Sequence, residues 1–102
     1  MKRPKTVDEY VDLVHQAVYE IDEFRTCLDY EPDNAEMFGP FLDQLDALVR
    51  KIYSDMTENA YDWGYGEDLS YMPLVVKYGR HIPFQYLLLV INETHKYGLD
   101  LD

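Results

Sequence analysis

The chain has 102 residues, 47% of them apolar, and a formal charge of −11 at neutral pH. This length predicts a single domain over residues 1–102, with residues 1–5 flexible, and the apolar share is enough for a packed core. The negative charge repels phosphate backbones and anionic lipids, which argues against direct binding of nucleic acid or membranes.

Compartment is predicted from three further features. The longest apolar run, residues 87–91, is far shorter than the ~20 residues of a membrane span. The basic start is not followed by an apolar segment of the kind that directs secretion. Cys27 is the one cysteine and cannot form a disulfide within the chain. Together these features predict a cytoplasmic protein.

The first predicted helix begins at Thr6. Thr6 and Glu9 have the spacing of a capping box, in which the Thr hydroxyl and the Glu carboxylate each accept a hydrogen bond from a backbone amide of the first turn. Apolar residues then recur at intervals of three and four, the pattern of a helix that buries one face. They are Val7, Tyr10, Val11, Val14, Ala17, Val18, Ile21, Phe24 and Leu28.

A break is predicted over residues 29–34, because the proline in this segment disfavours helix in the residue before it, and Asp and Asn favour turns. Asn34 is placed to cap a short helical turn. Gly39 and Pro40 then indicate a fresh start, with the proline at the first helical position. The second long helix is therefore predicted from Pro40 to Met56.

Residues 57–68 lose all periodicity and form the longest irregular stretch in the sequence. A short third helix is predicted over residues 71–78, with Ser70 as its N-cap and Gly79 closing it. The alternative is a short strand at residues 74–76, which are rich in β-branched side chains. No second strand is available to pair with it.

The fourth predicted helix runs from Pro83 to Tyr97, with Gly98 just past its end. It is apolar on more than one side, since Leu89 lies off the inner face. This pattern predicts a central helix or a homodimer interface through residues 83–97. Three long helices and one short helix with brief connections predict an all-α helical bundle.

Recognisable motifs for catalysis, cofactors and metals are absent from the sequence. The sequence has no HExxH, CxxC or EF-hand pattern. Gly64 and Gly66 form a lone G-x-G, followed by acidic residues that would repel a phosphate. The three histidines have ordinary surface, connection and helix-end positions. We therefore predict a protein that is not an enzyme, with no cofactor and no metal site.

Aromatic residues are the most informative feature for function, since ten tyrosines and one tryptophan are a heavy load for this length. Tyr and Trp anchor interfaces because they bury a large area with few rotamers, and acid around them selects a partner with Lys or Arg. The predicted partner-binding residues are Tyr30, Tyr61, Asp62, Trp63, Tyr65, Glu67 and Asp68. The other interpretation is that the 59–68 loop folds back and its aromatic rings close the end of the bundle.

Three functional hypotheses follow. The first is a non-enzymatic interaction module that docks a basic protein partner through this aromatic and acidic surface. A narrower alternative is an inhibitor or nucleic-acid mimic of a basic protein, whose carboxylates stand in for phosphates. The third is a small-molecule binding protein with a pocket at the bundle end near Trp63, His81 and Tyr86, because aromatic-lined pockets with a few polar groups are ordinary ligand sites.

Overall fold

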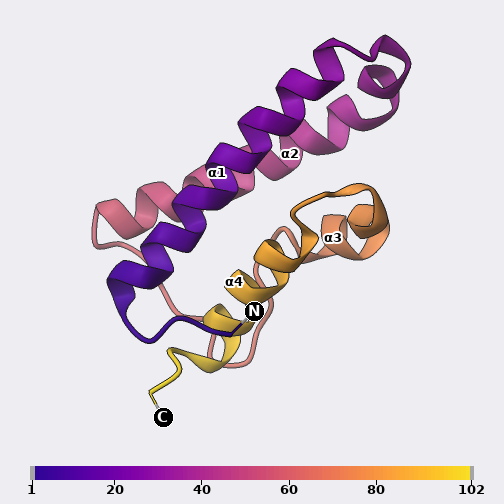
Figure 1. Ribbon diagram of the computed structural model, residues 1–102. Helices are drawn as coiled ribbons and strands as arrows, with labels where there is room; N and C mark the ends of the chain where they lie inside the picture. Colours follow the sequence, from indigo (N-terminus) through magenta and orange to yellow (C-terminus); the bar gives the residue numbers. More distant parts are fainter. Residues whose placement is uncertain (1, 102) are drawn as a thin grey trace.

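The computed structural model describes residues 2–101, apart from the side chains of residues 32, 34 and 35. Its elements are α1 (Val7–Asp29), α2 (Pro32–Thr57), α3 (Met72–Tyr78), the 3-10 helix η1 (Gly79–His81) and α4 (Gln85–Tyr97). The described chain contains no strand, so the prediction of an all-α bundle with three long helices and one short helix is confirmed (Figure 1). None of these helices is both long and apolar enough to span a bilayer.

Helix α1 begins as its sequence predicts. The Thr6 hydroxyl accepts from the Glu9 amide at 3.1 Å, and the Glu9 carboxylate accepts from the Thr6 amide at 3.3 Å, so both halves of the capping box are formed. Most of the apolar stripe is buried, with Val14 and Ile21 at 1% and 0% exposure. Val7 is the exception at 54%, because it lies at the free end of the stripe.

Helix α2 corrects the prediction of a separate turn before Pro40. It runs without interruption from Pro32, so Pro40 lies inside the helix, and Asn34 lies in its first turn with a side chain outside the described part. Pro40 removes one backbone hydrogen bond, at a cost of about 3 kcal/mol in a helix interior. Two features favour continuation: Gly39 has no Cβ to clash with the proline ring, and Phe41 buries its ring directly after it.

The third helix is shorter at its start than predicted. Tyr71 is its N-cap instead of Ser70, and residues 74–76 are helical, so the strand alternative is wrong. Gly79 does not close the helix in a left-handed conformation, because its φ of −51° carries the chain on into η1. Gly98, in contrast, has φ +85° just after α4, which confirms the predicted helix end.

Helices α1 and α2 form a long antiparallel hairpin, joined by Tyr30 and Glu31. Helix α4 packs against α1, with α3 beside it, so these two helices form a second layer on the hairpin (Figure 1). The two ends of the chain meet where α1 begins and α4 ends: the Asp100 amide donates to the Pro4 carbonyl at 2.8 Å. The loop of residues 58–71 crosses to the same end.

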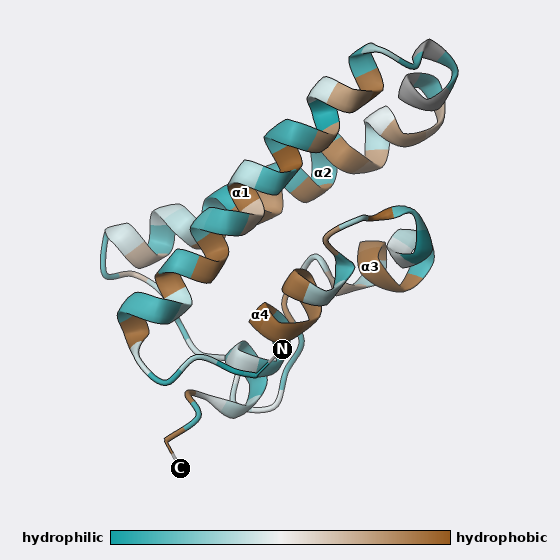
Figure 2. Ribbon diagram, viewed as in Figure 1, coloured by the Kyte–Doolittle hydropathy of each residue, from teal (hydrophilic) through white to brown (hydrophobic). Residues whose placement is uncertain are grey.

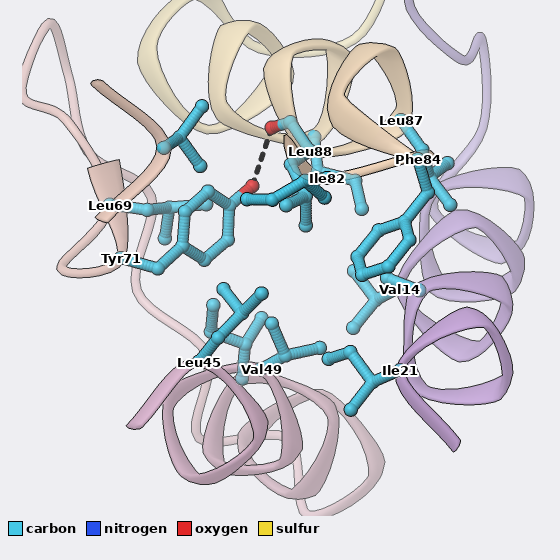
Figure 3. Close-up of a cluster of buried hydrophobic side chains, with 14 of the residues drawn as sticks. Val14, Ile21, Leu45, Val49, Leu69, Tyr71, Ile82, Phe84, Leu87 and Leu88 are labelled. Atoms are coloured by element: carbon cyan, nitrogen blue, oxygen red, sulfur yellow. Dashed lines mark hydrogen bonds between the residues drawn. The ribbon is translucent and has the colours of Figure 1, made fainter. Parts of the chain in front are cut away.

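The core lies where α1, α2 and α4 face one another. In Figure 2 the hydrophobic colour runs through much of α4, whereas α1 alternates between hydrophobic and hydrophilic. Figure 3 shows side chains of the three helices meeting, together with the buried Tyr71, whose hydroxyl donates to the Leu88 carbonyl at 2.6 Å. The largest fully buried side chains are Tyr10, Val14, Ile21, Leu42, Leu45, Val49, Tyr71, Leu88, Ile91 and Thr94.

Candidate functional site

An aromatic cluster of Tyr10, Tyr61 and Trp63 closes the end of the bundle where α1 begins and α2 ends. The Trp63 ring stacks on Tyr10 with centroids 5.3 Å apart, and Tyr61 stands at 81° to the Tyr10 ring and 82° to the Trp63 ring. Tyr10 is 1% exposed, whereas Tyr61 and Trp63 come from the loop and are partly buried. The loop therefore folds back so that these two rings extend the core.

A chain of hydrogen bonds connects this cluster to α4. The hydroxyl oxygens of Tyr10 and Tyr61 are 2.7 Å apart, and the Tyr61 hydroxyl is hydrogen-bonded to Nδ1 of His95. Burial raises the pKa of Tyr61 to about 12 and raises that of Tyr10 further, while burial lowers the pKa of His95. All three groups are therefore neutral near pH 7, and Tyr61 donates to the unprotonated Nδ1.

This chain has an acceptor at each end. Nδ1 of neutral His95 is one acceptor, and the Ile91 carbonyl, 3.2 Å from the Tyr10 hydroxyl, is the other. When His95 is protonated, Nδ1 becomes a donor, both hydroxyls can turn round, and Tyr10 then donates to Ile91. With neutral His95 the two hydroxyl hydrogens form two of the three contacts, and with protonated His95 all three are formed, so the cost of protonation is mainly the desolvation of the charged ring.

The two glycines of the loop have a structural role at the end of α4. The Gly64 amide donates to the His95 carbonyl and the Gly66 amide to the Lys96 carbonyl, both at 2.9 Å, which satisfies two carbonyls of the last turn. A Cβ on Gly64 would collide with the His95 ring, and Gly66 has φ +99°. Gly64 therefore allows the loop to approach α4 closely, and Gly66 allows a left-handed backbone conformation.

The last part of the loop is held by Asn92, which is 5% exposed. Its side-chain oxygen accepts from the buried Leu69 amide at 2.7 Å, and its side-chain nitrogen donates to the Asp68 carboxylate at 2.9 Å. Lys96 lies 3.3 Å from the same carboxylate. The hydrogen bond from Asn92 and then the Lys96 charge lower the pKa of Asp68.

The predicted partner-binding residues are divided between the two ends of the bundle. On the loop, Asp62, Tyr65 and Glu67 are exposed, and Tyr65 is 89% exposed. Tyr30, at 83%, follows the far end of α1. Twenty residues of helix separate Tyr30 from Tyr10, a rise of about 30 Å. The acidic turn and the loop therefore do not form one continuous surface.

The predicted pocket residues do not converge either. His81 packs against the ring of Phe38, with centroids 5.1 Å apart, near the beginning of α2. Trp63 lies near the end of α2, in contact with Tyr10, and Tyr86 is 76% exposed on the first turn of α4. The sequence could not place His81, because that position depends on how η1 packs on the hairpin.

Two open hollows instead flank Trp63. The first, of about 200 Å³, lies between the start of α1 and the end of α2, and Tyr61 also lines it. The second, of about 290 Å³, is bordered by Tyr65, Lys96 and Tyr97. Both hollows have aromatic walls, but only the second is lined by a charged cationic side chain, Lys96.

The other end of the hairpin is an acidic tip, which we define as residues 20–37. This segment holds seven acidic residues and one basic residue, Arg25. The Arg25 guanidinium lies 2.6 Å from Asp43 and 2.9 Å from Asp46, both on α2 beyond the tip. Tyr30 and Met37 are 83% and 66% exposed among these acids. The tip thus combines apolar and acidic side chains on one exposed end.

Within residues 2–101, no group of three or more His, Cys, Asp or Glu side chains could hold a metal ion. The chain matches no protein-family model, no curated protein and no solved structure in these comparisons. A functional assignment therefore depends on the sequence and on the geometry of the two ends.

Proposed function

We propose that this protein is a non-enzymatic interaction module that docks a basic protein partner on its acidic tip. The observation that supports the proposal is the exposure of Tyr30 and Met37, at 83% and 66%, within a segment of seven acidic residues and one basic residue. Tyrosine is one of the residues that contribute most to binding energy at interfaces. Tyr30 would be the anchor, and the surrounding carboxylates would select lysine and arginine.

The ion pairs of the two hairpin arginines use one acidic residue of the tip, Asp22, and otherwise use Asp43 and Asp46 of α2. Arg25 is already bound by Asp43 and Asp46, and Arg50 of α2 binds Asp22 at 2.7 Å and Asp46 at 2.6 Å. Three of these pairs join α1 to α2 and the Arg50–Asp46 pair lies within α2, so both cations are held along the hairpin. A basic segment approaching the tip would be attracted by the negative charge, and its association rate would fall as salt is added.

The test compares the two exposed tyrosines at opposite ends of the molecule. Immobilised wild-type protein, Tyr30→Ser and the matched control Tyr65→Ser are exposed to proteins from the source cells. We expect a basic protein to bind the wild type and Tyr65→Ser, to bind Tyr30→Ser about tenfold or more weakly, and to dissociate as salt is raised. Equal binding to Tyr30→Ser, or a bound partner that is not basic, would refute the proposal.

The same experiment separates the narrower form of this function. If the partner is a nucleic-acid-binding protein, its DNA or RNA binding is measured with and without the acidic protein. Competition at stoichiometric amounts would identify the protein as an inhibitor or nucleic-acid mimic, because the carboxylates of the tip would then occupy the site of the phosphates. Simultaneous binding of both would restrict the function to docking.

A further inference from the structure

The first hollow beside Trp63 is a gap in the covering of the α1 apolar stripe. Val7 and Val11 belong to that stripe, but Val7 is 54% exposed and Val11 is only partly buried. Helix α2 ends at Thr57, and Met56 forms the opposite wall of the hollow. The volume of about 200 Å³ is below the usual range of drug-sized pockets, about 300–1,000 Å³. The hollow therefore suits a small ligand with an apolar part.

The aromatic side of the hollow is suited to a cation. Trp63 and Tyr61 both line it, with ring centroids 5.4 Å apart and an angle of 82° between the ring planes. A cation is attracted to the face of an aromatic ring within about 6 Å of its centroid, and Trp is the most favourable ring; because Tyr10 covers one face of Trp63, the cation would use the other. The stacking of Trp63 on the buried Tyr10 holds this corner in position.

The charged residues that adjoin a lining residue of this hollow in the chain are all acidic. Asp8, Glu58 and Asp62 are exposed, and each adjoins a lining residue in the chain, whereas no lysine or arginine does so. The second hollow, on the other side of Trp63, differs because Lys96 lines it. Trp63 therefore borders one hollow with acidic neighbours and one hollow lined by Lys96. The hollow lined by Lys96 serves as an internal control, because a cationic ligand should not favour it.

We propose that the first hollow binds a small organic cation of the alkylammonium class, such as a quaternary ammonium compound. The positive group would lie in the corner of Trp63 and Tyr61, and the alkyl part would cover Val7 and Val11. Asp62 would contribute long-range attraction. This site is separate from the acidic tip, so either proposal can fail without affecting the other.

The experiment titrates full-length protein with choline and with its neutral carbon isostere, 3,3-dimethylbutan-1-ol, at constant ionic strength. Binding is followed by the methyl NMR signals of Val7 and Val11 and by Trp63 fluorescence. We expect saturable shifts with choline and at least about fivefold weaker binding of the neutral isostere, because only the cation interacts with the ring quadrupole. Equal binding of the two compounds, or unmoved valine signals, would overturn the assignment.

Two variants and one further ligand complete the test. Asp62→Asn changes an exposed side chain without touching the core, and we expect it to weaken choline binding about twofold or more. Tyr65→Leu alters the second hollow and should leave choline binding unchanged. If a lysine-containing peptide bound more tightly than choline, the proposal of a small-molecule ligand would be overturned, because the natural occupant of the hollow would then be a protein side chain.

Discussion

Replacement of Asn92 by alanine is the sharpest test of how the loop is held. The wild-type side chain accepts from the Leu69 amide at 2.7 Å and donates to Asp68 at 2.9 Å. Leu69 is 7% exposed, so its amide would be left buried without an acceptor, at a cost of about 1–3 kcal/mol. The lost bond to Asp68 adds about 1 kcal/mol. We expect a total loss of about 2–4 kcal/mol in the free energy of unfolding.

Urea denaturation followed by circular dichroism measures this change, with Glu93→Ala as the matched control. Glu93 is the next residue of α4 and is exposed, so its replacement should change stability by no more than about 0.5 kcal/mol. The Asn92 variant should also lower Tm by roughly 10 °C or more at this chain length. Amide hydrogen exchange should accelerate first at Leu69. A loss no larger than that of the control would refute the reasoning.

Three further predictions concern pH, ion pairs and association. The pKa of His95 is lowered below its ordinary value of 6.5, so the unfolded state binds more protons and the free energy of unfolding should fall as pH drops below about 6.5. His95→Gln should remove this dependence in pH-dependent denaturation, while replacement of the exposed His15 should keep it. Asp46→Asn removes the carboxylate that pairs with both Arg25 and Arg50. It should lower the free energy of unfolding by about 1 kcal/mol at low salt and by less in 1 M NaCl, because salt screens exposed ion pairs. An equal loss at both salt concentrations would contradict this prediction. Sedimentation should detect a homodimer through residues 83–97 that Tyr86→Lys weakens, and a monomer at high concentration would rule it out. Leu89 is itself partly buried against the core, and Tyr86, at 76%, is the most exposed aromatic residue that the structure describes in that helix.

Local signals in the sequence predicted the parts of the fold that depend on near neighbours. Thr6 and Glu9 lie three residues apart, so their capping box was readable from spacing, and Gly98 marked the end of α4 for the same reason. The signal at Gly39 and Pro40 was also local, but it was misleading. A proline costs one hydrogen bond, whereas a continuous α2 buries Phe41 and the apolar residues after it, and such packing routinely overrides intrinsic propensity.

The candidate sites were only partly predictable. Sequence reasoning selected Tyr61 and Trp63 from the irregular loop and Tyr30 from the acidic turn, but it did not find Tyr10 or His95 as their partners. The Tyr10–Tyr61 and Tyr61–His95 hydrogen bonds join residues 51 and 34 positions apart. Periodicity reports which face of a single helix is apolar, and it carries no information about which residue of another element lies opposite.

By itself, the sequence determined the helical class, the acidic charge and the apolar faces, because each is a property of composition or of one helix at a time. Packing between distant segments places the loop over one end of the bundle, puts Tyr30 about 30 Å of helix away from that end, and forms the hollows beside Trp63. These three features depend on the length of α1 and on which carbonyl groups of α4 accept hydrogen bonds from the loop amides. Both follow from packing between elements distant in the chain, where burial of apolar area and satisfaction of buried polar groups are decided together.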